Sequence, residues 1–169
     1  MRKLLAATAV MAALSLGGAQ TLVVGQSGLP VTLDSSQDGN SLTPAIQVVE
    51  RLVGFGQGTA VIEPLLATSW EANEDATVWT FQLREGVSFT DGTPFDAEAV
   101  KFNFDRWNHL DHEYNFTDQG KNYTSFTYVF GAHHGQDGYQ IESVDVIDDH
   151  TVQFTLTGSF GYFPQQLAS

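Results

Sequence analysis

The run from Leu66 to Arg106 constrains the fold more than any other part of the chain, because its hydrophobic periodicity changes within it. Apolar residues alternate with polar ones between Val78 and Leu83, and alternate residues of a strand share one face. This spacing predicts a strand with Trp79, Phe81 and Leu83 on its buried side.

Turn residues follow this strand. Gly86 can take a positive φ at little cost, so Arg84-Glu85-Gly86 is expected to turn the chain. Val87 and Phe89 are then expected to form a short second strand. Asp91-Gly92 is a tight-turn dipeptide, and Thr93-Pro94 keeps the next residues extended.

A helix is predicted after the second turn. Asp96 suits the position before its first turn, where a carboxylate accepts backbone N–H bonds. Apolar residues then recur every three or four positions, which is typical of a helix with one buried face. They are Ala97, Val100, Phe104 and Trp107.

These residues carry a resemblance. The string W-x-x-x-x-D-x-x-x-W-T-F-x-L-R-x-G-V-x-F-x-D-G-x-P-F-x-A-x-x-V, from Trp70 to Val100, resembles the family 5 extracellular solute-binding proteins, the peptide and nickel receptors of bacterial ABC importers. Its structural motif residues are Trp70, Phe81, Leu83, Arg84, Gly86, Phe89, Asp91, Gly92 and Pro94. A second match, D-D-x-T-V-x-F-x-L, runs from Asp148 to Leu156.

The resemblance implies an α/β fold: the N-terminal part of a two-lobed periplasmic-binding-protein fold of type II, with a mixed sheet, hairpins and short helices. Members of the family are several-fold longer than this chain. We therefore expect residues 20–169 to form the N-terminal part of the first lobe, with the second lobe absent and the reading frame truncated or split.

The first 19 residues have the three-part order of a secretory signal peptide. Arg2 and Lys3 form a positive start, Leu4 to Leu16 is apolar, and small residues precede a cleavage site after Ala19. The first mature residue would be Gln20, and a bacterial lipoprotein needs cysteine there. We expect a periplasmic protein without a lipid anchor.

The formal net charge is −13, and removal of Arg2 and Lys3 would leave five basic and 20 acidic residues, or −15. Such a chain repels phosphate backbones and anionic lipids, so nucleic-acid binding is not expected. The chain contains no cysteine, and no disulfide stabilises it.

Other elements are less sharply indicated. Thr21 to Gly25 is a candidate first strand, and Thr43-Pro44 would open a helix through about Val53, ended by Gly54 and Gly56. Tyr123 to Phe130 is aromatic, and its sequence leaves helix and strand open. The residues from Ile141 to Leu156 are expected to form a hairpin around Asp148-Asp149.

Two groups of residues are candidate ligand contacts. On the resemblance, the loop Ser27-Gly28-Leu29-Pro30 is expected to face the cleft between the lobes, where its backbone could pair with a peptide. Tyr123, Phe126 and Tyr128 could supply aromatic area to a pocket that accepts varied side chains, or they could be core residues.

Histidines are the remaining chemical feature. His109 and His112 are three residues apart, His133 and His134 are adjacent, and His150 stands alone. Imidazole binds metals, but these residues lack the spaced partners of a closed site, so solvated loop histidines are expected and no metal or cofactor.

The function implied by the resemblance is a periplasmic substrate-binding component that carries dipeptides or oligopeptides to an ABC permease in the inner membrane. We expect a monomer without catalytic residues that closes around its ligand. An oligosaccharide or nickel-complex receptor on the same scaffold remains an alternative, as does a secreted standalone domain or enzyme.

Overall fold

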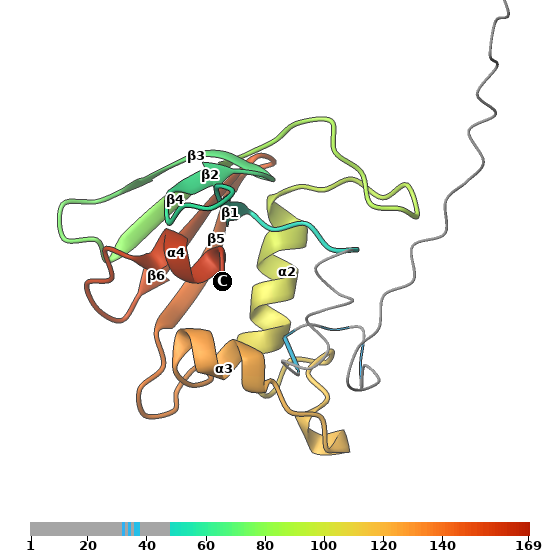
Figure 1. Cartoon of the computed structure of the whole chain (residues 1–169). Helices are drawn as coiled ribbons and strands as arrows, with labels where there is room; N and C mark the ends of the chain where they lie inside the picture. The colour runs from blue at the N-terminus through green and yellow to red at the C-terminus, as the bar shows by residue number, and fades with distance from the viewer. Residues whose placement is uncertain (1–31, 33, 35, 38–47) are drawn as a thin grey trace, which may run out of the picture.

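The computed structural model describes residues 32, 34, 36, 37 and 48–169. The strands in these residues (Figure 1) are β1 (Val53–Phe55), β2 (Ile62–Pro64), β3 (Ala67–Ala72), β4 (Val78–Leu83), β5 (Ile141–Asp148) and β6 (Thr151–Leu156). The helices in the same residues are α2 (Ala97–Asn108), α3 (Thr124–Phe130) and α4 (Phe163–Leu167), and η2 (Thr117–Gln119) is a 3-10 turn.

Several sequence predictions fall on residues outside this description. They are the signal peptide at residues 1–19, the strand from Thr21 to Gly25, the loop from Ser27 to Pro30 and the helix start at Thr43-Pro44. Within the described residues, no helix is both long and apolar enough to span a bilayer.

The larger sheet has four strands in the order β3-β4-β6-β5, and every neighbouring pair is antiparallel. A smaller sheet pairs β1 with β2, also antiparallel. The central pairing aligns Trp79 with Phe154 and Phe81 with Val152, so their side chains lie on the same face. The sheet therefore has one apolar face, on which the core is built.

Strand β4 shows why this face is apolar. Trp79, Phe81 and Leu83 are buried, whereas Gln82 between them is exposed. The predicted face assignment is therefore confirmed. Burying a large apolar side chain stabilises a fold by roughly 1.5–3 kcal/mol, so this alternation strongly favours the observed register over a one-residue slip.

Helix α2 lies against β5 and β6 on the apolar face. Its predicted N-cap is confirmed, because the Asp96 carboxylate accepts a bond of 2.9 Å from the Ala99 backbone N–H. The ring of Phe104 meets the edge of Phe154 at a centroid distance of 4.9 Å. At the far end, the buried Asn108 amide donates to the Ile141 carbonyl, which fixes the helix along the sheet.

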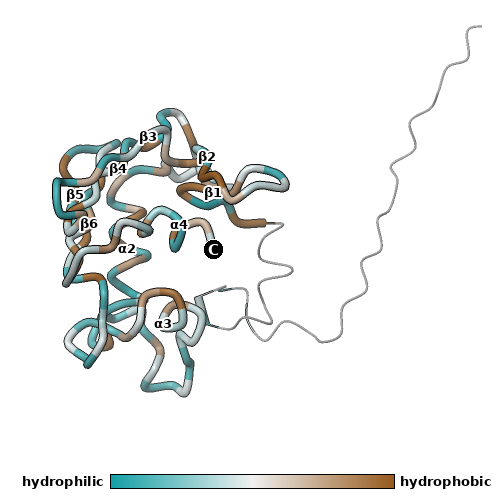
Figure 2. The backbone as a smooth tube through the Cα atoms, turned by 60° about the vertical axis from the view of Figure 1, so that its left-hand side comes forward, coloured by the Kyte–Doolittle hydropathy of each residue, from teal (hydrophilic) through white to brown (hydrophobic). Residues whose placement is uncertain are grey.

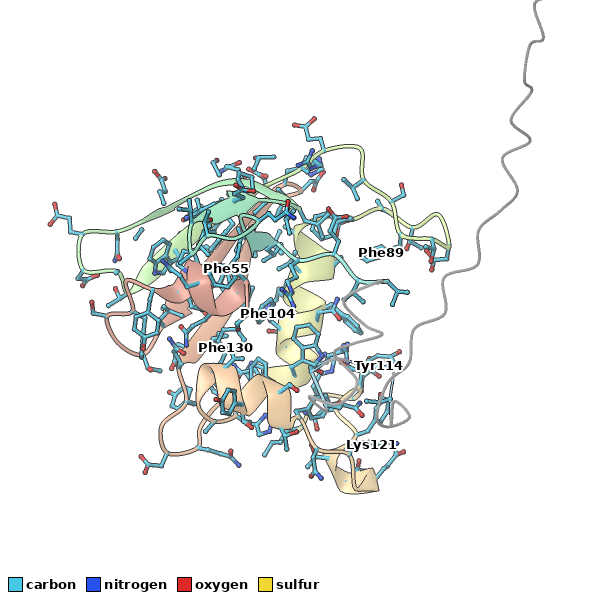
Figure 3. The ribbon with its side chains drawn as sticks, in the orientation of Figure 1. Phe55, Phe89, Phe104, Tyr114, Lys121 and Phe130 are labelled. Carbon is cyan, nitrogen blue, oxygen red and sulfur yellow. The ribbon has the colours of Figure 1, made fainter. Side chains whose placement is uncertain are left out.

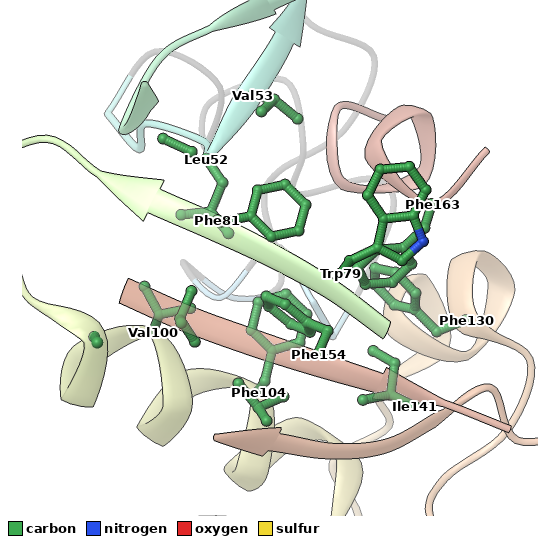
Figure 4. Close-up of a cluster of buried hydrophobic side chains, with 14 of the residues drawn as sticks. Leu52, Val53, Trp79, Phe81, Val100, Phe104, Phe130, Ile141, Phe154 and Phe163 are labelled. Carbon is green, nitrogen blue, oxygen red and sulfur yellow. The ribbon is translucent and has the colours of Figure 1, made fainter. Parts of the chain in front are cut away.

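Helix α4 contributes one aromatic side chain that joins the elements of the core (Figure 4). The ring of Phe163 lies 5.2 Å from Phe154, 6.3 Å from Phe81 and 6.1 Å from Phe130, measured between centroids. Figure 3 shows Phe104 and Phe130 on the inner side of their helices, with Tyr114 and Lys121 towards the outside. The core thus unites both sheets with α2, α3 and α4.

Three sequence predictions need correction or completion. Val53 does not end a helix; it begins β1 and pairs with Pro64, and Gly54 lies within that strand. Residues 87–89 form no strand beyond an isolated bridge from Ser88 to Pro94. The aromatic run from Tyr123 to Phe130, left open by its sequence, forms helix α3 from Thr124 onwards, with Tyr123 as the residue before it.

Tertiary contacts explain the first correction. Figure 2 shows the β1 segment as strongly hydrophobic, and Val53 is fully buried. The neighbouring Arg51 donates a bond of 2.9 Å to the Ala168 carbonyl at the end of α4. An extended chain lets Val53 pair with β2 while Arg51 bonds to the end of α4. These tertiary contacts outweigh the local helix pattern.

Candidate functional site

The candidate site is the surface where Asp34, Ser36 and Gln37 meet α2 and α3, near the lower end of α2 in Figure 1. Arg106, in the last turn of α2, donates from Nη1 to Asp34 Oδ2 at 2.6 Å. Both side chains are about four-fifths buried, with exposed fractions of 19% and 18%. Because both charges are largely removed from water, the ion pair depends on neighbouring hydrogen bonds to offset the cost of desolvation.

The backbone of the same segment bonds to the start of α3. The Gln37 carbonyl accepts from the Thr124 hydroxyl at 2.7 Å and from the Thr124 backbone N–H at 3.3 Å. The Ser36 carbonyl accepts from the Phe126 backbone N–H at 3.1 Å. The first N–H groups of a helix have no intrahelical acceptor, so these carbonyls cap α3.

The charge on Asp34 is well supported. Its carboxylate accepts from the Ser36 backbone N–H at 3.1 Å and from the Ser36 hydroxyl at 2.5 Å. Burial alone would raise the pKa of Asp34, but the hydrogen bonds from Ser36 and Arg106, with the charge of Arg106, hold that pKa below its ordinary value. The carboxylate is therefore ionised at neutral pH.

The partner guanidinium is equally constrained. Arg106 Nε donates to the Asn103 side-chain oxygen at 3.1 Å, and the guanidinium carbon lies 5.0 Å from the centroid of the Trp107 ring. Asn115 donates to the Arg106 carbonyl at 3.0 Å. These contacts orient the planar head towards Asp34, a role that a lysine ammonium would fill poorly.

The aromatic ligand candidates separate into two classes. Tyr123 and Phe126 are 2% and 3% exposed and belong to the core beside the loop that follows α3. Tyr128 points outwards on the same helix and is 92% exposed. The predicted group of three is thus not brought together on one surface, and Tyr128 alone has a ring open to solvent.

The first part of the structural motif supports the sheet. Trp70 pairs with Phe81 across β3 and β4, and their rings stack at a centroid distance of 6.3 Å. Leu83 is buried at the end of β4. Arg84 donates from Nε and Nη2 to the Leu65 carbonyl, which holds the two strands together where β4 ends.

The second part shapes the loop before α2. Gly86 and Gly92 have φ values of 70° and 88°, as the predicted turns require. The Asp91 carboxylate accepts from the Thr93 backbone and hydroxyl, and Pro94 forms the bridge to Ser88. Phe89 is half exposed and contacts Phe95 edge to face. The motif residues therefore support the scaffold, and their contacts do not assemble a group of side chains suited to catalysis or ligand binding.

Three of the histidines make ring contacts that the sequence did not suggest. His133 stacks on Phe126, and its Nδ1 lies 2.9 Å from the Trp107 carbonyl. The rings of His109 and His134 lie 4.5 Å apart, centroid to centroid. In the described part of the chain, no three or more His, Cys, Asp or Glu side chains are grouped to hold a metal ion.

Sequence reasoning missed the pairing of Asp34 with Arg106. In the sequence, Arg106 stands out only as the last residue of the run that begins at Leu66. The Asp-x-Ser spacing is a local signal, because an aspartate often bonds to its own backbone two residues on. Nothing local indicates a partner 72 positions away.

Comparison with known proteins covers most of the chain. The family model for bacterial extracellular solute-binding proteins, family 5 middle, matches residues 61–169. The probable D,D-dipeptide-binding periplasmic protein DdpA of Escherichia coli K12 is 32% identical over 88% of this chain and 26% of its own length. The nickel-binding periplasmic protein of Escherichia coli K12 is 46% identical over a shorter stretch, 38% of this chain and 12% of the relative.

A solved structure agrees with this match. The periplasmic binding protein DppA of Helicobacter pylori, in complex with the peptide STSA, superposes with a TM-score of 0.66 and 32% identity over 80% of this chain. The chain spans 27% of that protein and 26% of DdpA, so it corresponds to about a quarter of each. The chain belongs to the family 5 bacterial extracellular solute-binding proteins.

Proposed function

We propose that this protein is a periplasmic receptor that binds peptides and delivers them to an ABC importer. The observation that carries the proposal is the likeness to a peptide-bound solved structure at a TM-score of 0.66 and 32% identity. The D,D-dipeptide-binding relative, matched over 88% of this chain, points to the same ligand class.

The proposed mechanism is closure of two lobes around a peptide, with the closed form recognised by a permease in the inner membrane. The loop Ser27-Gly28-Leu29-Pro30 would offer backbone N–H and C=O groups to an extended peptide, as an edge strand does. Main-chain pairing holds peptides of different sequence, because it does not depend on their side chains.

Among the aromatic candidates, Tyr128 suits contact with another molecule. Its side chain is 92% exposed, whereas Tyr123 and Phe126 are committed to the core. An exposed aromatic ring offers apolar area and a hydroxyl for hydrogen bonding. We assign any aromatic contact with the ligand or the second lobe to Tyr128.

The family consists of solute-binding proteins rather than enzymes, and its members are extracellular. We extend this to a protein that does no chemistry on its ligand and acts as a monomer. Residues 1–19 would direct export, and a first mature residue other than cysteine would leave the protein without a lipid anchor.

A nickel-complex receptor is the second candidate, supported by the nickel-binding relative with 46% identity over 38% of the chain. That stretch covers 12% of the relative's own length. The peptide proposal rests on matches more than twice as long on this chain, so we favour it.

The test is calorimetry on the protein purified from the periplasm of its native host, with intact mass measured first. The probes are the dipeptide Ala-Leu, the tetrapeptide Ser-Thr-Ser-Ala, the nickel–histidine complex and maltotriose. We expect saturable heat with one or both peptides and none with the other two probes.

Saturation with the nickel complex alone would replace the peptide proposal by the second candidate, and saturation with maltotriose alone would indicate an oligosaccharide receptor. Absence of heat with every probe would overturn the binding function. The intact mass shows whether the binding species starts at Gln20, as export with cleavage requires.

A further inference from the structure

The loop between α3 and β5, residues 131–140, is attached to the end of α2. The His134 backbone N–H donates to two oxygens of Asn108, the backbone carbonyl at 2.9 Å and the side-chain carbonyl at 3.0 Å. The same buried Asn108 side chain donates to the Ile141 carbonyl at the start of β5. The last residue of α2 therefore holds the loop and the sheet together.

Two imidazole rings lie at this attachment. The rings of His109, the residue that caps the end of α2, and of His134 lie 4.5 Å apart between centroids, with 41° between their planes. Their side chains are 30% and 35% exposed, so both rings are mainly covered but can exchange protons with solvent. Neutral imidazoles pack at this distance, whereas two imidazolium ions repel each other. The pair therefore tolerates one positive charge better than two.

The charged groups that face His109 are of both signs. Asp105 Oδ1 lies 3.9 Å from His109 Nε2, but Asp105 Oδ2 already pairs with Lys101 Nζ at 2.8 Å. Burial is the largest cause that lowers the pKa of His109, followed by the charge of His134, and Lys101 acts in the same direction. The carboxylates of Asp105 and Asp111 oppose these effects. Protonation of His109 is thus resisted by its burial and by a charge on its partner.

Glu142 and Tyr139 face His134 from β5 and the loop. Glu142 Oε1 lies 3.9 Å from His134 Nε2, beyond hydrogen-bond distance, and Glu142 Oε2 accepts a bond of 2.6 Å from the Tyr139 hydroxyl. This bond raises the pKa of Tyr139 above its ordinary value, so the tyrosine is neutral near pH 7. The Tyr139 ring lies edge to face with the His134 ring at 5.2 Å. Glu142 therefore compensates a first proton on the pair better than a second.

We propose that His109 and His134 form a pH-sensitive switch, which holds residues 131–140 on the end of α2 while at least one imidazole is neutral and releases them when both carry a proton. Histidine suits such a switch because its charge changes between about pH 5 and pH 8. Where two sites repel each other, protons bind in two steps that belong to the pair. The first step leaves the loop attached, and the second opens it. This inference does not depend on which ligand the protein binds.

Release of the loop exposes part of the core beside α3. The ring of His133 stacks on Phe126 at a centroid distance of 6.0 Å, and His133 Nδ1 lies 2.9 Å from the Trp107 carbonyl. A proton on His133 leaves that contact in place, because an imidazolium nitrogen donates to a carbonyl. Movement of the adjacent His134 away from α2 separates His133 from Phe126. The expected acid form keeps its sheet and loses the cover on this side of α3.

The test variants are His109→Gln and His134→Gln, each of which leaves one imidazole of the pair, together with their double variant. The matched control is His150→Gln. The neighbour of His150, Asp149, accepts through its carbonyl from the Ala97 N–H at the start of α2, so the control lies at the opposite end of that helix. The side-chain resonances of both histidines are titrated by NMR between about pH 8 and pH 5. Hydrogen-exchange protection is measured at the amide of residue 134 and at the amides of β4.

We expect protection at the amide of residue 134 to fall at least about tenfold from pH 8 to pH 5 in the wild type and in His150→Gln, after correction for the exchange rate of an unfolded peptide. The single and double variants should lose less than about twofold, because no second proton can bind to the pair. Protection in β4 should stay unchanged. The paired resonances should titrate in two steps in the wild type and in one step in each single variant.

Three results would overturn the switch. The first is an equal loss of protection in a single variant, since one imidazole would then suffice to release the loop. The second is an equal loss in β4, which would mean that the whole chain unfolds. The third is unchanged protection in the wild type after both imidazoles have titrated, which would show that the loop accommodates two charges. The two single variants are read separately, so the test stands if one of them fails to fold at pH 8.

Discussion

The rings of Phe81 on β4 and Phe154 on β6 meet edge to face, with centroids 5.6 Å apart and planes at 80°. Neither ring has measurable exposure. Phe154 in turn contacts Phe104 of α2 and Phe163 of α4, so this one pair joins two strands to two helices. Edge-to-face aromatic pairs add about 0.5–1.5 kcal/mol beyond the area that they bury.

Replacement of Phe81 by alanine tests this assignment. Phe81→Ala should lower the free energy of unfolding by about 3–5 kcal/mol, because it leaves a cavity at the centre of the core. Urea denaturation followed by tryptophan fluorescence measures the change. The exposed neighbour Gln82 is the control, and Gln82→Ala should cost less than about 1 kcal/mol. A loss below that value for Phe81→Ala would show the face assignment to be wrong.

The N-cap of α2 is a second test. Asp96→Ala removes the acceptor of the Ala99 backbone N–H and should cost about 1 kcal/mol of stability. Glu98→Ala changes an exposed carboxylate in the same first turn and should cost about half a kcal/mol or less. Equal losses in thermal denaturation would mean that the charge near the helix start matters and the capping bond does not.

The loop after α3 contains two glycines at which an added side chain would meet different surroundings. Both Gly131 and Gly135 have positive φ, at 85° and 78°. A Cβ at Gly131 would lie 2.2 Å from the Gly138 carbonyl oxygen, whereas a Cβ at Gly135 meets nothing within 4 Å. Gly135→Ala should cost about 1–2 kcal/mol from the left-handed backbone alone.

Gly131→Ala adds the clash to a backbone conformation, φ 85° and ψ −97°, that is itself unfavourable for alanine, so it should cost at least about 3 kcal/mol. Chemical denaturation of the two variants, made in parallel, gives both values. Similar losses would show that Gly138 moves aside at little cost and that the loop is less closely packed than its contacts indicate.

The His109–His134 pair predicts a pH dependence. Burial, followed by the charge of His134 and Lys101, lowers the pKa of His109 below its ordinary value of 6.5, against the opposing charges of Asp105 and Asp111. The unfolded state therefore binds this proton more readily than the folded state. The contribution of His109 to stability is fully present above pH 6.5 and is lost as the pH falls towards its folded pKa.

His109→Gln should remove that part of the pH dependence. Denaturation midpoints between about pH 5 and pH 8 should show a shallower fall towards acid in the variant than in the wild type. A steeper acid loss in His109→Gln would reverse the sign of the inferred shift.

Local patterns predicted the elements whose signal lies within a few positions of the chain. The alternation around Phe81, the Asp96 cap and the hairpin at Asp148-Asp149 were read from spacing, and the structure confirms them. Two predictions failed at residues whose backbone pairing the spacing did not indicate. Val53 looked like the end of a helix, yet its pairing with Pro64 makes it a strand residue. Val87 and Phe89 alternate correctly, but the bridge from Ser88 to Pro94 extends no further.

The sequence predicted the candidate site less completely than the fold. Phe126 and Tyr128 lie in one short helix and Tyr123 precedes it, and residue type alone did not reveal that only Tyr128 of the three faces solvent. Helical spacing shows which side chains share a face, but which face is covered depends on the elements packed against it. Here the loop carrying His133 lies on Phe126.

The sequence by itself determined the scaffold, because strand alternation, helix spacing, capping and turn residues act over a few positions and add up to one consistent pattern. That pattern carried the resemblance to family 5 solute-binding proteins. Only the tertiary structure decided that Asp34 meets Arg106, that His109 faces His134 and that Tyr128 is open to solvent. Such pairings depend on packing between segments far apart in the chain, which no local preference specifies.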